Sequence, residues 1–535
     1  MGYKDMSTSF PIQAIGVGGV NTDIDDWNLQ PNQLSYGLNY RTLDDKLQSF
    51  NGNTVVYTPP SNFYGGKLLY AYSKGNAFYI VLGRTANKVF DGSSWYNISS
   101  LAMSTAAYVL GADDELKWTV CMLGSIPVIN NPQGTVEYWL PQQTSQILQP
   151  LNFDATHTFT AKGYSAKVFR AHKNFLFALN LTEGGVQLPY AYRWSHPAVI
   201  NGLPFSWDPL DLSTIAGKSQ IAGNGGDIID GLSLRDDFII YSAKSITVLQ
   251  FTGDENVWQA RPLSASYGLL AIDCLVEVKG IHYFIAEGDI FQNDGSSITS
   301  ILSSKMRNRL RNNLSTTSYQ NCFAIAQLNK SEVWFCIVEQ GSHVAGATNA
   351  LPNMTFIYNF ETGSISIREV DTLVAGKAYA PIVAAPDTWG SDSSPWSTDG
   401  TTWGTNQYSL FGEQIIGIRP SDSAIVALEQ QNPSTNLNTV LERTGLEITP
   451  GRVTQVVRVK PKITCSDTVL IQIGKQDSAG GTVTWTAARV FNPNTQKSVP
   501  IKARGPYICY QISSIAATSF TFSSITFEVE DAGER

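Results

Sequence analysis

The chain has 535 residues, a net charge of −8 and only 15% charged residues, against about 25% in an average soluble protein. Hydrophobic residues make up 43% of the chain and aromatic residues 11%, which excludes a disordered protein. The acidic balance argues against a protein whose main task is to grip nucleic acid, because phosphates require basic surfaces. The abundance of glycine, tyrosine and phenylalanine favours strands joined by tight turns.

The six cysteines lie inside apolar runs and form no C-x-x-C motif, which predicts buried, reduced thiols. The first residues lack the apolar core of a secretory signal. No apolar stretch approaches the ~18 residues that span a bilayer. We therefore expect a soluble protein with no membrane-spanning segment, which does not leave the cell through a classical signal.

Residues 1–60 are predicted to form an N-terminal arm and the first strands of a platform. The glycine-rich runs 16–19 and 223–226 are interpreted as turns, because a dinucleotide-binding loop requires a helix directly after it. Asp23, Asp25 and Asp26 offer oxygen atoms to Ca²⁺. The segment lacks the glycine and the distal glutamate of an EF-hand, so no metal site is assigned.

Residues 61–440 repeat one pattern: a short strand, a polar turn of two or three residues, and a second strand that opens on an aromatic residue. Turn chemistry predicts a β-hairpin for each copy. The copies lie at 69–82, 168–179, 231–241, 275–285 and 322–335. Aspartate–glycine turns at 89–95 and 290–298 predict a further hairpin after some of them.

Two hairpins in series make a four-stranded meander. The aromatic anchors Phe175, Phe238, Tyr283 and Trp334 recur with a loose period near ~40–50 residues, which is typical of propeller blades. The prediction for 61–440 is therefore an irregular β-propeller of about six blades with insertions. One insertion, the Trp-rich stretch 384–406, is expected to be a long exposed loop.

Two basic features stand out from the acidic chain. Residues 299–314 have apolar residues at helical spacing and predict an amphipathic helix that carries Lys305, Arg307, Arg309 and Arg311. Arg458, Lys460 and Lys462 alternate along a predicted strand and share one face. Contact with DNA, docking on an acidic partner, and a solvated face all fit these features.

The candidates for catalysis are weak. Residues 397–403 resemble the aspartate box of sialidase-type propellers but are one residue short, and that box is a structural turn in any case. The histidines have no metal-binding spacing and are interpreted as structural; they are His157, His172, His196, His282 and His343. No pair of carboxylates for glycoside hydrolysis is apparent. We assign no catalytic, cofactor-binding or metal-binding residue.

From about residue 441 the alternation of apolar and polar residues becomes regular. Residues 441–535 are predicted to form a small antiparallel β-sandwich that completes the platform. The fold class is therefore all-β, with an irregular propeller and a sandwich.

These segments together resemble the tail nozzle proteins (tail tubular protein B and related tail hub proteins) of short-tailed bacteriophages. The most specific likeness is the hairpin at 234–241 that leads to 246–253, to 288–295 and to the basic helix. Further likeness lies at 18–23, 29–34, 38–41, 128–132, 192–195, 205–208 and in a sandwich that ends at Gly533, Glu534 and Arg535.

The resemblance implies a virion structural protein without catalysis or cofactor, assembled in the host cytoplasm. It implies a ring, usually a hexamer, below the portal and adaptor, with fibres, spikes or tip proteins attached. Duplex DNA would pass through the lumen without specific binding. Because a basic wall would hold the phosphates, we expect the lumen to be lined by Asp, Glu, Ser, Thr, Asn and Gln.

Two other functions remain open from the sequence. A propeller of this size can carry a glycan-degrading enzyme, or it can be a glycan-binding module. Release of reducing ends from a host polysaccharide tests the first, and a glycan array tests the second.

Overall fold

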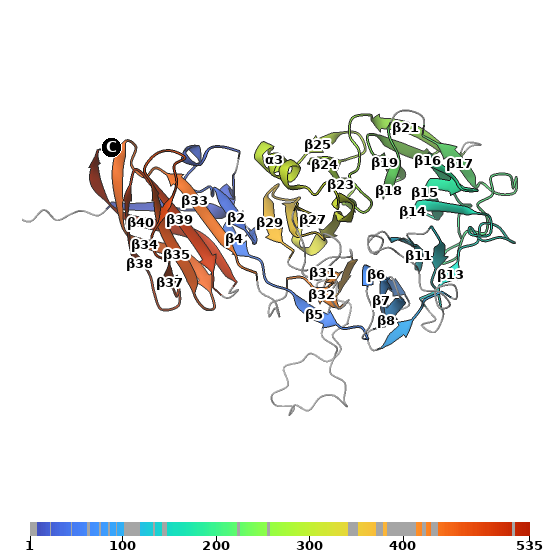
Figure 1. The fold of residues 1–535 in the computed structure, drawn as a ribbon, viewed down its shortest axis with the longest axis horizontal. Helices are drawn as coiled ribbons and strands as arrows, with labels where there is room; N and C mark the ends of the chain where they lie inside the picture. Colours follow the sequence, from blue (N-terminus) through green and yellow to red (C-terminus); the bar gives the residue numbers. More distant parts are fainter. Residues whose placement is uncertain are drawn as a thin grey trace, which may run out of the picture.

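The computed structural model describes residues 8–534 except 22, 44, 61–64, 74–75, 84–85, 92–93, 101–117, 132–133, 142–146, 222–224, 254–256, 341–350, 371–377, 382–412, 420–423, 430–436 and 516–518. Two β bodies lie beside each other along the long axis of the molecule (Figure 1). One is a ring of four-stranded antiparallel sheets, and the other is a two-sheet sandwich. The all-β propeller with a small sandwich is therefore confirmed.

Seven four-stranded sheets are present in the described part of the chain, one more than the sequence predicts, and we number them as blades in chain order. Blade one contains β6 (Gly65–Ser73), β7 (Asn76–Gly83), β8 (Asn87–Phe90) and β9 (Trp95–Asn97). Blade two contains β10 (Thr119–Leu123), β11 (Ile126–Asn130), β12 (Val136–Tyr138) and β13 (Gln149–Pro150). Blade three contains β14 (Tyr164–His172), β15 (Phe175–Glu183), β16 (Val186–Trp194) and β17 (Gly217–Gln220).

The remaining blades continue the ring. Blade four contains β18 (Ile228–Leu234), β19 (Asp237–Ser242), β20 (Ile246–Phe251) and β21 (Trp258–Ser264). Blade five contains β22 (Leu275–Val278), β23 (Ile281–Ala286), β24 (Asp289–Asn293) and β25 (Ile298–Ser300). Blade six contains β26 (Phe323–Gln327), β27 (Glu332–Ile337), β28 (Met354–Asn359) and β29 (Ile365–Glu369). Blade seven contains β30 (Ala378–Pro381), β31 (Glu413–Ile418), β32 (Ile425–Ala427) and, from the start of the chain, β5 (Thr54–Tyr57).

Blade seven closes the ring with strands from both ends of the propeller segment. Val55 of β5 pairs with Val426 of β32 in antiparallel register. This pairing explains the difference in blade count, because a count of consecutive hairpins cannot include a blade whose fourth strand is supplied from the N-terminal arm. The prediction that residues 1–60 form only an arm and platform strands is therefore wrong for β5, which belongs to the propeller.

Each predicted hairpin is present, as β6–β7, β14–β15, β18–β19, β22–β23 and β26–β27. Four of these turns place a non-glycine residue in the left-handed region: Lys173 (φ 52°), Arg235 (φ 54°), Lys279 (φ 50°) and Ser331 (φ 55°). Positive φ in the turn matches the right-handed twist of the flanking strands, which is why these hairpins stay tight. The aromatic that follows each turn is buried in the second strand, as Phe175, Phe238 and Tyr283 show.

Apolar side chains fill the space between successive blades all the way round. Phe78 and Trp139 join blades one and two, and Phe177 stacks on Phe238 between blades three and four at 4.3 Å between ring centroids. Between blades seven and one, Ile416 packs in one cluster with Leu68. The ring is therefore held by burial at its interfaces as well as by the ladder of its last blade.

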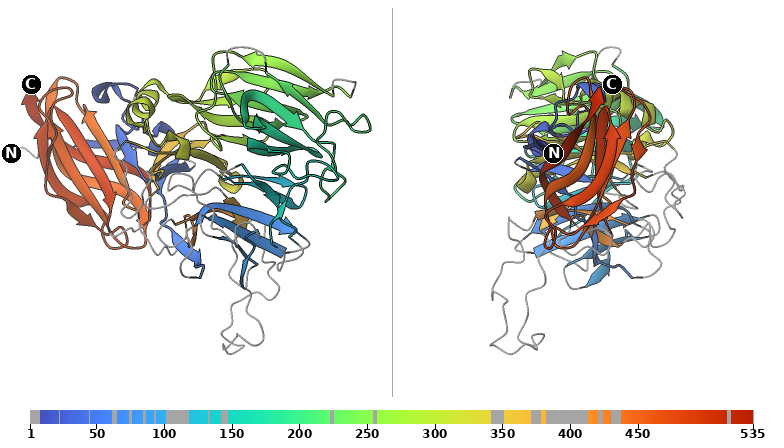
Figure 2. Two further views of the ribbon diagram at one scale, coloured as in Figure 1. Left: turned by 45° about the vertical axis from the view of Figure 1, so that its right-hand side comes forward. Right: turned by 90° about the vertical axis from the view of Figure 1, so that its left-hand side faces the viewer.

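The sandwich has two six-stranded sheets. One contains β1 (Thr8–Ile12), β3 (Tyr40–Leu43), β4 (Lys46–Ser49), β34 (Arg452–Cys465), β38 (Val499–Gly505) and β40 (Phe520–Glu534). The other contains β2 (Tyr36–Leu38), β33 (Val440–Leu446), β35 (Val469–Gln476), β36 (Thr484–Trp485), β37 (Arg489–Phe491) and β39 (Tyr507–Ser514). The N-terminal strands β1 to β4 thus complete a sandwich that otherwise comes from the C-terminal segment, and both ends of the chain lie at this body (Figure 2).

The helical elements are short: α1 (Ile15–Gly18), α3 (Ser304–Asn313) and the 3₁₀ turns η1 (Asp26–Asn28), η2 (Tyr319–Asn321) and η3 (Leu328–Lys330). The amphipathic helix predicted over 299–314 is α3, and it starts later because β25 extends to Ser300. Its apolar face is confirmed by the burial of Met306 and Leu310. None of the described helices is long and apolar enough to cross a membrane.

All six cysteines are free thiols, four of them buried. Burial raises the pKa of Cys322 and Cys336 to about 12, so both stay protonated at neutral pH. They pack as small apolar side chains, as the sequence predicts.

Candidate functional site

A cavity of about 430 Å³ is lined by residues of blades two, three and four and of the segments that lead into blades five and six. Its apolar wall includes Trp118, Ile228 and Leu270. Amide, hydroxyl and charged groups make up the rest; they include Asn130, Asn131, Ser165, Lys167, Asn180, Thr182, Asp227 and Asp273. The volume and the mixed lining are in the range of small-molecule sites.

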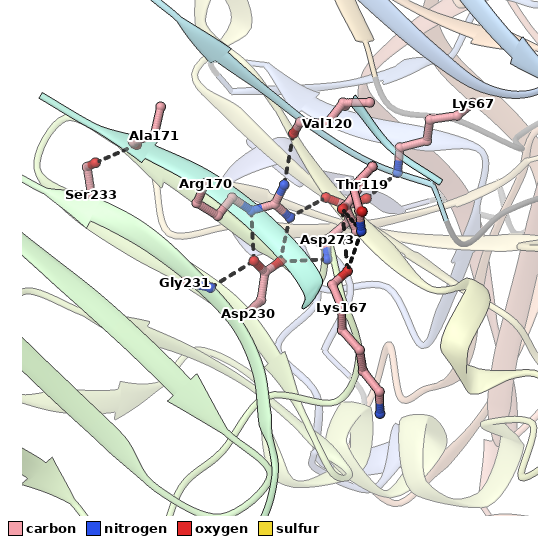
Figure 3. A network of polar contacts seen from close by, with 11 residues as sticks. Lys67, Thr119, Val120, Lys167, Arg170, Ala171, Asp230, Gly231, Ser233 and Asp273 are labelled. Carbon is pink, nitrogen blue, oxygen red and sulfur yellow. Dashed lines mark hydrogen bonds and ion pairs between the residues drawn. The ribbon is translucent and has the colours of Figure 1, made fainter. Parts of the chain in front are cut away.

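Beside this cavity, buried charges join the first strands of neighbouring blades (Figure 3). Arg170 of β14 donates from Nε and Nη2 to both carboxylate oxygens of Asp230 in β18, each at 2.8 Å. The same guanidinium donates to Asp273 Oδ1 at 3.0 Å and to the carbonyl of Val120 in β10 at 2.9 Å. Lys67 of β6 is ion-paired with the other oxygen of Asp273. One network therefore links blades one to five.

Arg170, Asp230 and Asp273 bond to one another and to backbone groups of the same chain. Asp230 also accepts from the backbone N–H of Gly231 at 2.7 Å and from that of Asp273 at 3.0 Å. Burial alone would lower the pKa of Arg170, but Asp230 and Asp273 outweigh it and raise that pKa, so the guanidinium stays charged. Asp273 contacts both cations, with one carboxylate oxygen toward Arg170 and the other toward Lys67, so both oxygens are occupied within the network. This geometry fits a structural role, in which the network holds neighbouring blades together.

Sequence reasoning missed these residues, although a signal for them exists. Arg170 lies between apolar residues near the end of β14, Asp230 is the one charged residue of the strand β18, and Asp273 lies two residues before β22. A charge at the same place in successive hairpins indicates an ionic contact around a common axis.

A second buried network fastens the sandwich to the propeller. Arg41 of β3 donates to both oxygens of Glu332 in β27, at 2.8 and 2.9 Å. It also donates to Glu429, directly after β32, at 2.7 Å, and Lys330 donates to the same carboxylate at 2.6 Å. Burial raises the pKa of Glu332 above its ordinary value, with Arg41 opposing the shift. A sandwich residue thus holds blades six and seven together.

Two histidines are buried at blade interfaces, which fits the structural role predicted for them. His172 Nδ1 lies 2.8 Å from Ser233 Oγ, between blades three and four. His282 Nε2 donates to the carbonyl of Ser233 at 2.8 Å, and its Nδ1 lies 3.0 Å from the hydroxyl of Tyr241. Burial lowers the pKa of both imidazoles to about 4, so they are neutral at physiological pH.

His157 and His196 are nearer the surface. His157 Nδ1 lies 2.9 Å from Asp154 Oδ1, three residues before it. His196 accepts from the backbone N–H of Ile215 at 3.3 Å. His343 lies outside the described residues. Across the described residues, no group of three or more His, Cys, Asp or Glu side chains is placed to hold a metal ion.

The basic side chains of α3 have partners within the molecule. Arg307 Nε lies 2.9 Å from Asp289 Oδ2, and Arg311 donates to the carbonyl of Gly288 at 3.1 Å. Lys305 donates through Nζ to the carbonyl of Ile24 at 3.0 Å. Arg309 lines a small cavity with Tyr36. These contacts favour an internal role for the helix over DNA contact.

The basic face of β34 is different. Lys460 Nζ lies 2.5 Å from Glu528 on the paired strand β40, and Arg458 Nε lies 3.7 Å from the same carboxylate. Arg458, Lys460 and Lys462 are exposed, so the prediction that they share one face is confirmed. Among the three interpretations, a solvated face fits these weak, exposed pairs best.

The remaining sequence motifs also have structural explanations. Asp23 accepts from the backbone N–H groups of Ser304 and Lys305 and so caps α3, which leaves it no role in a Ca²⁺ loop. Gly16 and Gly18 lie in the short helix α1 rather than in the predicted turn, and glycine is needed there because a Cβ atom would clash with the backbone of Lys46 or Asn32. Gly225 and Gly226 lie outside helices and strands, and residues 384–406, with the aspartate-box segment 397–403, lie outside the described residues.

No protein-family model matches the chain, and no curated protein matches it. Several solved structures have a similar fold. YCF48 from Cyanidioschyzon merolae is 8% identical with a TM-score of 0.36, over 71% of this chain and all of that one. The extracellular domain of the one-component system BT4673 from B. thetaiotaomicron is 10% identical with a TM-score of 0.39, over 88% of this chain and 59% of that one. An exo-β-1,3-galactanase from Phanerochaete chrysosporium is 11% identical with a TM-score of 0.28, over 82% of this chain and all of that one. Likeness at this level concerns the β-propeller fold and says nothing about function.

Proposed function

We propose that this chain is a structural subunit of a short-tailed bacteriophage tail nozzle. In this proposal, copies of the chain, most simply six, form a ring below the portal and adaptor. The ring conducts DNA during ejection and holds fibres, spikes or tip proteins, and the protein acts in the virion tail without catalysing a reaction.

The observation that carries the proposal is the mechanical joining of the two bodies. The N-terminal segment supplies four strands to the sandwich and then β5 to the propeller. Arg41 and Asp23 add a buried ion network and a helix cap across the same junction. A subunit that forms part of a tube wall and resists mechanical force needs a stiff connection between its two domains, whereas a recognition domain on a flexible linker does not.

Charge supports the same function. The Arg170 network ties blades one to five to one another, so we expect a channel for duplex DNA to form between copies rather than through one ring of blades. The net charge of −8 and the internal contacts of Arg307 and Arg311 favour a wall that does not retain phosphates. We expect a lumen lined mostly by Asp, Glu, Ser, Thr, Asn and Gln.

Imaging of tail particles with this chain located in them tests the proposal directly. The expected result is a ring of copies below the adaptor with an acidic or neutral lumen. A lumen lined by Lys and Arg would refute the charge argument. A chain that stays monomeric, alone and in the presence of adaptor and other tail components, would refute the nozzle itself.

A second candidate, a glycan-binding module, is favoured by the central cavity. Asn131, Asn180 and Asp227 there offer the amide and carboxylate groups that bind sugar hydroxyls, and Trp118 offers an aromatic wall. Binding on a glycan array that is lost in Asp227→Ala would support this candidate. Release of reducing ends from a host polysaccharide would instead support a glycan-degrading enzyme.

A further inference from the structure

Lys67 is the one lysine that is almost fully buried in the described part of the chain, with a side chain that is 5% exposed. Its ammonium contacts Oδ2 of Asp273, whose side chain is 7% exposed (Figure 3). Among the described residues, Asp273 is its only hydrogen-bond acceptor. An ammonium carries three N–H donors, so one acceptor satisfies it poorly in a buried site. A buried lysine of this kind is a candidate nucleophile, because loss of a proton frees its lone pair.

The backbone of Asp273 is held in an unusual conformation. Its φ of 65° lies in the left-handed region, which residues other than glycine seldom adopt. Its N–H donates to Asp230 Oδ2 at 3.0 Å, and its carbonyl accepts from the N–H of Ala324 at 2.8 Å. Strands of blades four and six therefore fix the residue that presents its carboxyl group to Lys67 of blade one. Groups that are fixed in contact react far faster than groups that must first meet.

The second oxygen of the same carboxyl group faces a cation. Asp273 Oδ1 accepts from Arg170 Nη2 at 3.0 Å. A guanidinium in this position would stabilise the negative charge that develops on Oδ1 when an amine attacks Cγ. Arg170 is itself held by both oxygens of Asp230, each at 2.8 Å, so it is in place before any reaction begins. The site thus contains a nucleophile, an electrophile and a preordered donor for the oxyanion.

We propose that Lys67 and Asp273 condense to form an isopeptide bond, an amide between the two side chains. A proton passes from Nζ of Lys67 to the contacting Oδ2 of Asp273, and the neutral amine then attacks Cγ. The Nζ–Cγ bond forms, Oδ2 takes a second proton from the nitrogen, and the Cγ–Oδ2 bond breaks with release of one water molecule. The reaction consumes no oxidant, cofactor or second substrate.

The product fits the site better than the ion pair does. The amide nitrogen carries one N–H in place of three donors, and Oδ1 becomes a carbonyl oxygen that still accepts from Arg170. Arg170 keeps its bidentate partner Asp230. The reaction also removes two opposite charges from a buried position, where ions are costly.

The bond would join blade one to the segment that leads into blade five, across 206 residues of the chain. Blades two, three and four would then lie within one covalent loop, which would resist the separation of blades under force. The inference goes beyond the proposed function and does not depend on it.

Mass spectrometry of the denatured full-length protein tests the bond. We expect an intact mass that is lower than the sequence requires by one water molecule, and a branched peptide on digestion that contains both Lys67 and Asp273. A mass without this deficit, or a water loss located at other residues, would overturn the inference. The wild type alone decides the question, so the result does not depend on the folding of a variant.

Lys67→Arg is the matched variant, because arginine keeps a positive charge opposite Asp273 but its guanidinium does not form the amide. It should have no mass deficit and should migrate more slowly than the wild type on a denaturing gel, since its chain contains no closed loop. A deficit that persists in Lys67→Arg would contradict the assignment.

Lys330→Arg is the control. Lys330 lies 2.6 Å from Glu429 but is 35% exposed, and this variant should keep the deficit. A chain that carries the bond yet never assembles would count against the nozzle alone.

Discussion

The guanidinium of Arg170 is buried and relies on Asp230 and Asp273 for its charge balance. Asp230→Ala would remove the bidentate partner and leave the cation with Asp273 and the carbonyl of Val120, and breaking a buried pair from one side costs about 3–5 kcal/mol. We expect a clearly lower melting temperature in thermal unfolding. Glu528→Ala, which removes an exposed partner of Lys460, is the matched control and should leave the melting temperature unchanged. Equal effects of both variants would contradict the structural role of the network.

The buried imidazoles of His172 and His282 predict an acid dependence of stability. Burial lowers both pKa values from an ordinary 6.5 to about 4, so the unfolded chain binds protons first as the pH falls. The free energy of unfolding should therefore decrease between about pH 6.5 and pH 4. Melting temperatures measured across this window should fall less in the double variant His172→Gln/His282→Gln, relative to its own value at pH 7.5. An identical slope in both proteins would show that other groups cause the loss.

At the scale of single elements, the hairpins follow from local chemistry. The turn at Lys173 and Asn174 and the alternation around it are contained within one stretch of sequence, so the pattern predicts β14 and β15 correctly. Blade seven is different because β5 pairs with β32 across nearly the whole propeller. The candidate site could not be predicted for the same reason, since its residues come from distant segments. Arg170, Asp230 and Asp273 meet only when separate blades pack around one axis. Periodicity predicts elements, but not which distant charges face each other.

The closing strand β5 offers a direct test of this element. The ring of Tyr57 lies 4.2 Å from that of Phe90 and 5.3 Å from that of Tyr79, both in blade one. Tyr57→Ala removes these contacts and should cost about 2–4 kcal/mol, somewhat less than for a fully buried aromatic. Hydrogen exchange should accelerate in β5, β32 and β8. Tyr190→Ala, at a residue that is 45% exposed, should leave exchange in those strands unchanged.

At the scale of the whole molecule, Arg41 is the buried cation that links the sandwich to blades six and seven. Arg41→Ala leaves Glu332 and Glu429 buried close to each other, with Lys330 as the remaining cation near Glu429. We expect a loss of about 3–5 kcal/mol at pH 7.5. Removal of the cation raises the pKa of both carboxyls, so protonation at pH 5 should recover part of the loss. A deficit that grows as the pH falls would contradict this account.

The surface charge of the whole molecule predicts its behaviour toward nucleic acid. Because Lys305, Arg307 and Arg311 of α3 have internal contacts and the net charge is −8, the protein should not bind duplex DNA. Fluorescence anisotropy with a labelled duplex at low salt checks this. Binding that weakens steeply as salt is added would reveal a basic surface that the internal pairing does not neutralise.

The shared N-terminal segment also sets the order in which the protein can mature. Strands β1 to β5 are synthesised well before their partners β32, β33 and β40, and Arg41 meets a carboxylate 388 residues further along the chain. The propeller can close only after β32 has been made, and the sandwich can close only after β40 has been made. A chain that terminates before β32 therefore lacks the closing partners of both bodies, and the early strands must wait unpaired while the intervening blades fold.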